Sequence, residues 1–112
     1  MFATIRRFQA TPGYTQLLQT LKVDLKQAMI AKNGPEKNTI KAIMATIKNR
    51  EIDGAKQTET SLKRTLGKMI KQRKDSETLY RNQDRDDLAD VEQKETVFIQ
   101  KYLDTVEASE NK

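Results

Sequence analysis

The chain contains no cysteine and no histidine among its 112 residues. Without cysteine there can be no disulfide bond and no thiol nucleophile, and without either residue type there is no Cys/His zinc site. Histidine is also the usual general base near neutral pH. No glycine-rich phosphate loop is present. We therefore expect no self-contained catalytic site, no bound metal and no cofactor.

Glycine, proline and aromatic residues are scarce as well. The sequence has 4 Gly, 2 Pro and 5% aromatic residues, against 33% charged residues. Sheets favour β-branched and aromatic residues, whereas long exposed helices accept many charged ones. No apolar run approaches the roughly 20 residues that cross a bilayer. The composition predicts an all-α fold in one domain, without a membrane span.

Charge is divided unevenly along the chain. Residues 1–74 hold 16 Lys/Arg and 5 Asp/Glu, a net charge of +11, and residues 75–112 hold 5 basic and 11 acidic residues, a net charge of −6. One interpretation is that the two parts neutralise each other within a helical bundle. The other is that the basic part binds nucleic acid or another acidic partner.

The first 13 residues contain no acid. Arg6 and Arg7 lie among apolar residues, a composition typical of mitochondrial import signals. The sequence Arg6-Arg7-Phe8 also has the Arg-X-Phe pattern of a matrix-peptidase site, with cleavage after Phe8. One interpretation is that residues 1–13 are a targeting segment, which predicts a mitochondrial, matrix location, and the family resemblance given below favours it. The alternative is a frayed tail before the first helix.

Apolar residues then recur at helical spacing in four stretches. The domain is expected to span residues 14–107, followed by a polar tail over 108–112. The expected helices cover about residues 15–32, 36–52, 60–80 and 86–107, the last two forming a long antiparallel hairpin.

Local signals predict where these helices begin and end. Pro12-Gly13 is expected to break the chain, with Thr15 capping the first helix. Asn33-Gly34-Pro35 is expected to end that helix with a left-handed residue. Gly67, inside the third helix, is expected to lie at a close helix contact, because glycine otherwise costs about 1 kcal/mol there.

Each helix of the predicted hairpin carries a charged residue on its apolar stripe. These residues are Arg73 and Glu95. In an antiparallel hairpin the two can approach each other, and a buried charge left without its partner costs roughly 3–5 kcal/mol. We predict an Arg73–Glu95 ion pair that specifies helix register.

Four segments resemble the YqeY family, also called GatB/YqeY-like proteins, and its fungal mitochondrial branch in particular. The third of them is the most specific, and together they cover roughly residues 21–103. Family members continue past the last segment with proline and a second helical domain, whereas Asp104 follows Leu103 here. The resemblance is therefore to the N-terminal helical domain of the family. The segments are Asp24-Leu25-Lys26-Gln27-Ala28-Met29 with Lys32, Thr39–Lys41 with Ile47–Ile52, Lys71–Ser76, and Arg85–Ala89 with Glu95 and Ile99–Leu103.

The resemblance implies a multihelical fold related to the C-terminal region of the B subunit of the tRNA-dependent amidotransferase. That region is associated with tRNA contact and lacks the enzyme's amidase and kinase chemistry. The resemblance thus implies an accessory module that contacts tRNA or an amidotransferase-like protein. Two alternatives stay open: a component of a carbon–nitrogen ligase with glutamine as amido donor, and a helical protein–protein adaptor without nucleic acid.

The candidate binding residues form one basic stretch of the third helix. Such a face would contact phosphates without reading sequence. Base stacking is not expected, because two of the three tyrosines lie on apolar stripes. The alternative is a solvated helix surface. The residues are Lys63, Arg64, Lys68, Lys71, Arg73 and Lys74.

Two further clusters are expected to carry no chemistry. Asp75 and Ser76 are neighbours on a helix and point in different directions, so they do not form a nucleophile–base pair. The acids near the start of the fourth helix lack the spacing of a calcium loop and suit a solvated helix N-terminus. They are Asp84, Asp86, Asp87 and Asp90.

Overall fold

The computed structural model describes residues 10–110 and contains four α-helices and no strand in that range. The all-α prediction is confirmed. The part of the expected targeting segment that lies in residues 1–9 falls outside the described residues. The helices are α2 (Pro12–Ile30), α3 (Gly34–Ile52), α4 (Glu59–Asn82) and α5 (Asp86–Glu110).

Helix α2 begins three residues earlier than expected. Thr11 is its N-cap, and the Thr11 side chain accepts a hydrogen bond from the backbone N–H of Tyr14 at 3.3 Å. Pro12 occupies the start of the helix, where a residue without an N–H costs nothing and a fixed φ is already helical. The Pro-Gly pair therefore starts the helix, and the prediction that Thr15 caps it was wrong.

The turn between α2 and α3 also differs from expectation. Lys32 is the left-handed residue there, with φ 56°. Asn33 instead caps α3: its side chain accepts from the Glu36 N–H at 3.2 Å and donates to the Glu36 carboxylate at 3.1 Å. This reciprocal arrangement satisfies the first turn of α3, so the helix begins at Gly34, before the expected start.

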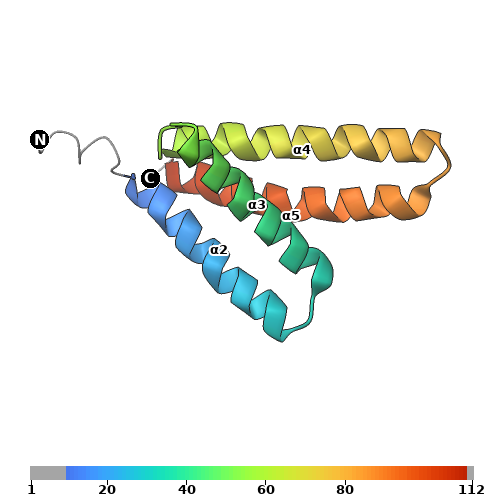
Figure 1. Ribbon diagram of the computed structural model, residues 1–112, viewed down its shortest axis with the longest axis horizontal. Helices are drawn as coiled ribbons and strands as arrows, with labels where there is room; N and C mark the ends of the chain where they lie inside the picture. The colour runs from blue at the N-terminus through green and yellow to red at the C-terminus, as the bar shows by residue number, and fades with distance from the viewer. Residues whose placement is uncertain (1–9, 111–112) are drawn as a thin grey trace, which may run out of the picture.

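Helices α4 and α5 form the long antiparallel hairpin that the sequence predicts, and Figure 1 shows them side by side along the molecule. A left-handed residue, Asp84 with φ 57°, lies in the turn between them. Helix α5 continues through Glu110, whose carboxylate binds the Lys63 amine at 2.6 Å. Residues 108–110, expected in the polar tail, are therefore helical.

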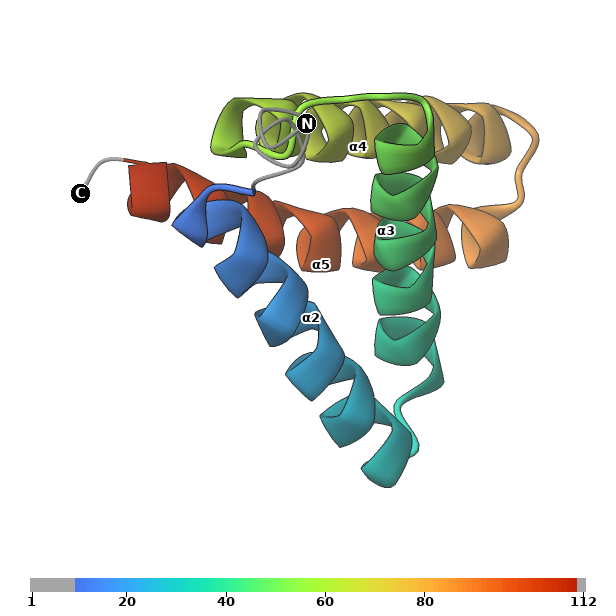
Figure 2. The same cartoon turned by 60° about the vertical axis from the view of Figure 1, so that its left-hand side comes forward.

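The hairpin of α2 and α3 packs across one half of the α4–α5 hairpin (Figures 1 and 2). The other half of α4–α5 projects beyond it, and there Leu79 and Val91 keep 60% and 50% of their surface exposed. The core therefore lies where all four helices meet. Its largest fully buried side chains are Tyr102, Leu21, Ile40, Ile43, Leu62, Leu66, Ile99 and Thr39.

Two buried tyrosines hold helices together, one within the α2–α3 hairpin and one between the two hairpins. Tyr14 of α2 donates its hydroxyl hydrogen bond to Glu51 near the end of α3. Tyr102 of α5 donates to Asp24 of α2 at 2.7 Å. Burial is the main cause that raises the pKa of Tyr14 and of Tyr102 above the usual tyrosine value, and the hydrogen bond to the carboxylate is the second. The first contact joins α2 to α3, and the second joins α2 to the long hairpin.

Gly67 does not lie at a close helix contact, so that prediction was wrong. A Cβ added to Gly67 would meet nothing within 4 Å outside its own helix turn. The close approach involves Gly13, where a Cβ would lie 2.7 Å from Glu59 Oε2 and 2.9 Å from Ser109 Oγ. A side chain at Gly13 would therefore require the Glu59 and Ser109 side chains to shift, whereas glycine is not sterically required at position 67 in α4.

Candidate nucleic-acid interface

A groove of about 280 Å³ lies between α3 and α4. The two helices touch only lightly, because α3 packs mainly against α2 and α5. Ala42 and Met69 supply apolar surface, and basic side chains come from both helices. The lining residues are Ala42, Thr46, Arg50, Arg64, Thr65, Lys68, Met69, Gln72 and Arg73.

The structure divides the six basic residues that the sequence analysis grouped together. Arg64, Lys68 and Arg73 line the groove. The other three belong to α4 but do not line it. They are Lys63, Lys71 and Lys74.

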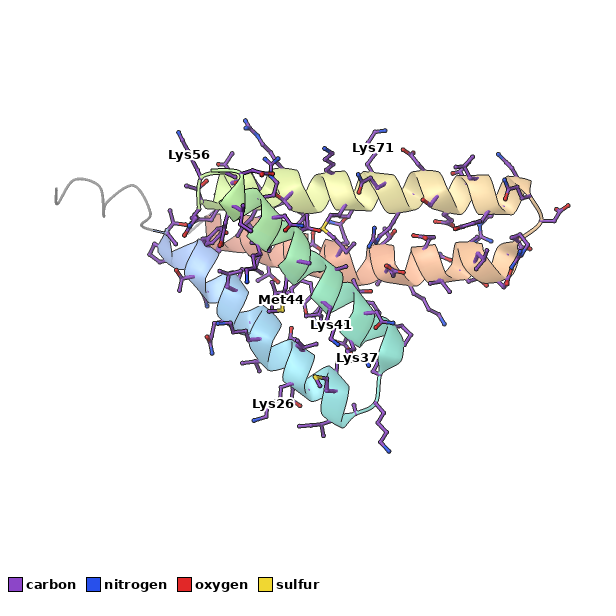
Figure 3. All side chains as sticks on the ribbon, viewed as in Figure 1. Lys26, Lys37, Lys41, Met44, Lys56 and Lys71 are labelled. Atoms are coloured by element: carbon purple, nitrogen blue, oxygen red, sulfur yellow. The ribbon has the colours of Figure 1, made fainter. Side chains whose placement is uncertain are left out.

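Each of these three residues has a different environment. Lys63 binds Glu110, and this hydrogen bond raises the pKa of Lys63. Lys71 is 77% exposed and forms an i,i+4 ion pair with Asp75 at 3.3 Å; Figure 3 shows it pointing away from α5. Lys74 lies beside Lys101 in a shallow hollow of about 530 Å³ along α5. Adjacent residues on a helix point about 100° apart, so Arg73 and Lys74 serve different faces.

Arg50 is a groove residue that lies outside the basic stretch predicted from the sequence. It lies in the last turn of α3 and reaches the groove from the side opposite α4's cations. The sequence contains a signal for it, because Ala42, Thr46 and Arg50 follow one another at intervals of four residues. Such a row occupies one side of a helix, and its two small members leave room beside a neighbouring helix.

The polar groups of the groove are mainly hydrogen-bond donors. Thr46 and Thr65 donate their hydroxyl hydrogens to carbonyls of their own helices, Ala42 at 2.8 Å and Ser61 at 3.0 Å. The donors left for a ligand are therefore the four cations and the Gln72 amide. No carboxylate belongs to the lining set. This arrangement suits an anion.

Arg73 and Glu95 are in contact. The Nε of Arg73 donates to Glu95 Oε2 at 3.1 Å, and the two side chains are 20% and 21% exposed. The contact joins α4 to α5, as register specification requires, while Arg73 also lines the groove. Nearby, burial and the charge of Glu95 raise the pKa of Glu92, and Arg73 opposes that rise. Arg73 is thus a groove cation that also lies next to two acidic residues of α5, Glu92 and Glu95.

Acidic residues at the tip of the long hairpin are paired with arginines. Arg81 binds Asp86 at 3.4 Å and Asp90 at 3.2 Å. Arg85 binds Asp87 at 3.3 Å, which lowers the pKa of Asp87. Within residues 10–110 no group of three or more acidic residues is arranged to hold a metal ion. Over the same residues no helix is long and apolar enough to cross a membrane.

The fold and the groove define a small all-α domain with a cationic groove between α3 and α4. The family model described as Yqey-like protein matches residues 18–111. The chain therefore belongs to the YqeY family, as the resemblance of its four segments indicated.

Three fungal relatives share the name "Altered inheritance of mitochondria protein 41, mitochondrial". The protein from Clavispora lusitaniae is 59% identical over 95% of this chain and 62% of its own length. The Meyerozyma guilliermondii protein is 52% identical over 91% of this chain and 54% of its own length. The Saccharomyces cerevisiae (strain YJM789) protein is 42% identical over 95% of this chain and 58% of its own length.

This chain therefore spans between 54% and 62% of the length of these relatives. Their names describe mitochondrial proteins, and the mitochondrial location predicted for this chain is confirmed at that level. The chain is a mitochondrial member of the YqeY family.

Proposed function

We propose that this chain is a non-catalytic accessory binding module of the mitochondrial matrix that contacts tRNA. The observation that carries the proposal is the groove between α3 and α4, where four cations meet and no carboxylate belongs to the lining. The family's relation to the C-terminal region of the B subunit of the tRNA-dependent amidotransferase suggests tRNA as the anion. An amidotransferase-like protein is the second partner that this resemblance suggests.

The chemistry of the groove favours binding over catalysis. Arginine stays protonated in proteins and cannot act as a general base, and the Gln72 amide does not titrate. The two groove hydroxyls donate to their own helices, whereas a nucleophilic hydroxyl needs an oriented base. The arginines and the Gln72 amide can therefore hold an anionic partner, and together with the two threonines they form no nucleophile–base pair.

Crosslinking in intact mitochondria tests the partner. The full chain is crosslinked in place, and bound RNA and proteins are identified from the same sample. We expect tRNA among the recovered molecules, with or without amidotransferase subunits. Recovery of neither tRNA nor any amidotransferase subunit would overturn the proposal.

An activity assay tests the non-catalytic part. The purified chain is mixed with misacylated tRNA and glutamine, and formation of the amidated aminoacyl-tRNA is followed. We expect no turnover unless other subunits are added. Sustained turnover by the chain alone would show that it is an enzyme.

We also propose that residues 1–13 direct import into the matrix. Their support is compositional, since Arg6 and Arg7 are the only charged residues of the segment. The variant Arg6→Glu/Arg7→Glu is expected to remain in the cytosol, and Lys22→Glu/Lys26→Glu, with the same change of charge in α2, to be imported. Normal import of the first variant would contradict this assignment.

A further inference from the structure

We infer that the groove between α3 and α4 is a preorganised site for the phosphate groups of an RNA backbone, in which Glu95 orients Arg73 as a direct phosphate ligand. This inference rests on the proposed function and makes it specific. It assigns a second role to an ion pair that the sequence analysis treated as structural only.

The contact of Arg73 with Glu95 leaves most of the guanidinium available. Arginine carries five N–H donors, and the inner nitrogen, Nε, is the one that binds Glu95. Neither terminal nitrogen of Arg73 makes a hydrogen bond within residues 10–110. The side chain is 20% exposed and lines the groove. Glu95 therefore fixes the plane of the guanidinium, and an oriented planar fork binds phosphate with little further loss of freedom.

The remaining cations stand on both walls of the groove. Arg50 comes from α3, and Arg64 and Lys68 come from α4. Within residues 10–110, these three side chains have no ion-pair partner. They can consequently bind an incoming anion without first breaking an internal pair. The packing of α3 against α2 and α5 sets the distance between the walls.

The length of the cationic row favours a polymer over a single phosphate. Arg64 and Arg73 are nine residues apart on α4, which corresponds to about 14 Å along a helix. A row of that length can meet more than one backbone phosphate. No aromatic residue belongs to the lining, so bases are not stacked there and binding should depend on the backbone instead of the sequence.

The experiment measures the affinity of the purified full chain for tRNA over a series of salt concentrations. The groove variant is Arg64→Gln/Lys68→Gln. Its control is Lys26→Gln/Lys41→Gln, which removes the same charge from exposed positions on α2 and α3 outside the groove (Figure 3). We expect the groove variant to lose about tenfold or more in affinity and about two units of salt slope, and the control to change affinity by less than about threefold.

Glu95→Gln separates positioning from general electrostatics. This variant makes the protein more positive by one charge, so a diffuse attraction for RNA would become stronger. If Glu95 orients Arg73, tRNA binding instead weakens by about threefold or more, and Glu95→Asp restores part of it. Circular dichroism and thermal unfolding confirm that each variant is folded. Unchanged or tighter binding by folded Glu95→Gln would overturn the role of Glu95.

Other outcomes distinguish the groove from the proposed function. If the groove and control variants weaken tRNA binding equally, the groove assignment fails while tRNA binding stands.

If the wild-type chain does not bind tRNA, the proposed function fails, and the groove is tested with inorganic pyrophosphate by amide NMR. Shifts centred on Gln72 and Arg73 would support a phosphate site, and their absence would overturn it. Equal affinity for polyglutamate and tRNA would overturn phosphate specificity.

Discussion

The Nε of Arg73 lies 3.1 Å from Glu95 Oε2, and this contact joins the two longest helices while one of its members lines the α3–α4 groove. Both side chains are about one fifth exposed. Salt screens an ion pair in this position less than it screens a surface pair. If one partner is removed, the other charge is left partly buried and poorly solvated. In the proposed site, stability and RNA binding would thus depend on the same two residues.

Replacing this pair with apolar residues should separate the two roles. Arg73→Met or Glu95→Leu alone should lower the free energy of unfolding by about 1–3 kcal/mol, because each leaves one charge half-buried. The double variant should recover most of that loss, because neither charge remains, but should still bind tRNA weakly. Urea unfolding and tRNA titration measure both effects. Wild-type tRNA affinity in the folded double variant would show that Arg73 does not bind the ligand.

Gly67→Ala should stabilise the protein. A methyl group at this position meets nothing within 4 Å, and alanine in a helix interior is favoured over glycine by about 1 kcal/mol. Gly54→Ala should have the opposite effect, because Gly54 has φ +88°, a conformation that costs a residue with a side chain roughly 1–2 kcal/mol. Thermal unfolding of the two variants checks the signs. A loss of stability in Gly67→Ala would mean that the glycine serves a contact absent from this structure.

Stability should fall at alkaline pH because of Tyr14 and Tyr102. Burial and the hydrogen bonds to Glu51 and Asp24 raise the pKa of both phenols in the folded chain. A tyrosine in the unfolded chain titrates near pH 10, so the two buried phenols make their full contribution to the free energy of unfolding below about that pH. Above it the unfolded chain loses protons that the folded chain keeps, and the free energy of unfolding falls by about 1.4 kcal/mol per pH unit for each tyrosine.

The variant Tyr14→Phe/Tyr102→Phe isolates this effect. It should be less stable near neutral pH, because Glu51 and Asp24 each lose a hydrogen-bond donor. Its free energy of unfolding should fall less steeply than that of the wild type between about pH 9 and about pH 11, because the two phenols are missing. Lysines also titrate in this range, but they do so in both proteins and do not affect the comparison. Equal slopes would contradict the raised tyrosine pKa values.

Lysines of α4 outside the groove should matter little for RNA binding. Lys63 and Lys71 already bind Glu110 and Asp75, and exposed charges separated from the ligand are screened by salt. Lys63→Gln/Lys71→Gln should therefore keep tRNA affinity within about threefold of the wild type at physiological salt. A loss as large as that caused by the groove variant would restore the single basic face that the sequence suggested.

The hairpin and the Arg73–Glu95 contact could be predicted from the sequence for the same reason. Apolar residues at helical spacing define which side of each helix is buried, and a charge on that side requires a partner from the facing helix. The helix caps were harder to predict from the sequence, because Thr11 and Thr15 both have suitable side chains. The cap depends on whether Pro12 ends one segment or begins the next.

The groove itself could not be predicted, since it depends on how α3 crosses α4. The helical periodicity of α3 locates its buried side but not the neighbour that lies beside Arg50. Similarly, the run Lys71–Lys74 looked like one basic centre, whereas the structure places Arg73 in the groove and Lys74 in a hollow along α5. These assignments require the crossing of the two hairpins, which follows from the packing of all four helices.

Site-specific photocrosslinking shows whether tRNA lies in the α3–α4 groove. A photoreactive residue is placed in the full chain at Gln72, which lines the groove, or at Gln93, which lies on the surface of α5 outside it. Both positions are exposed glutamines within helices, so the substitutions are closely matched. We expect tRNA to be captured from position 72 and position 93 to give only background. Equal capture from both positions, or capture from position 93 alone, would contradict binding in the α3–α4 groove.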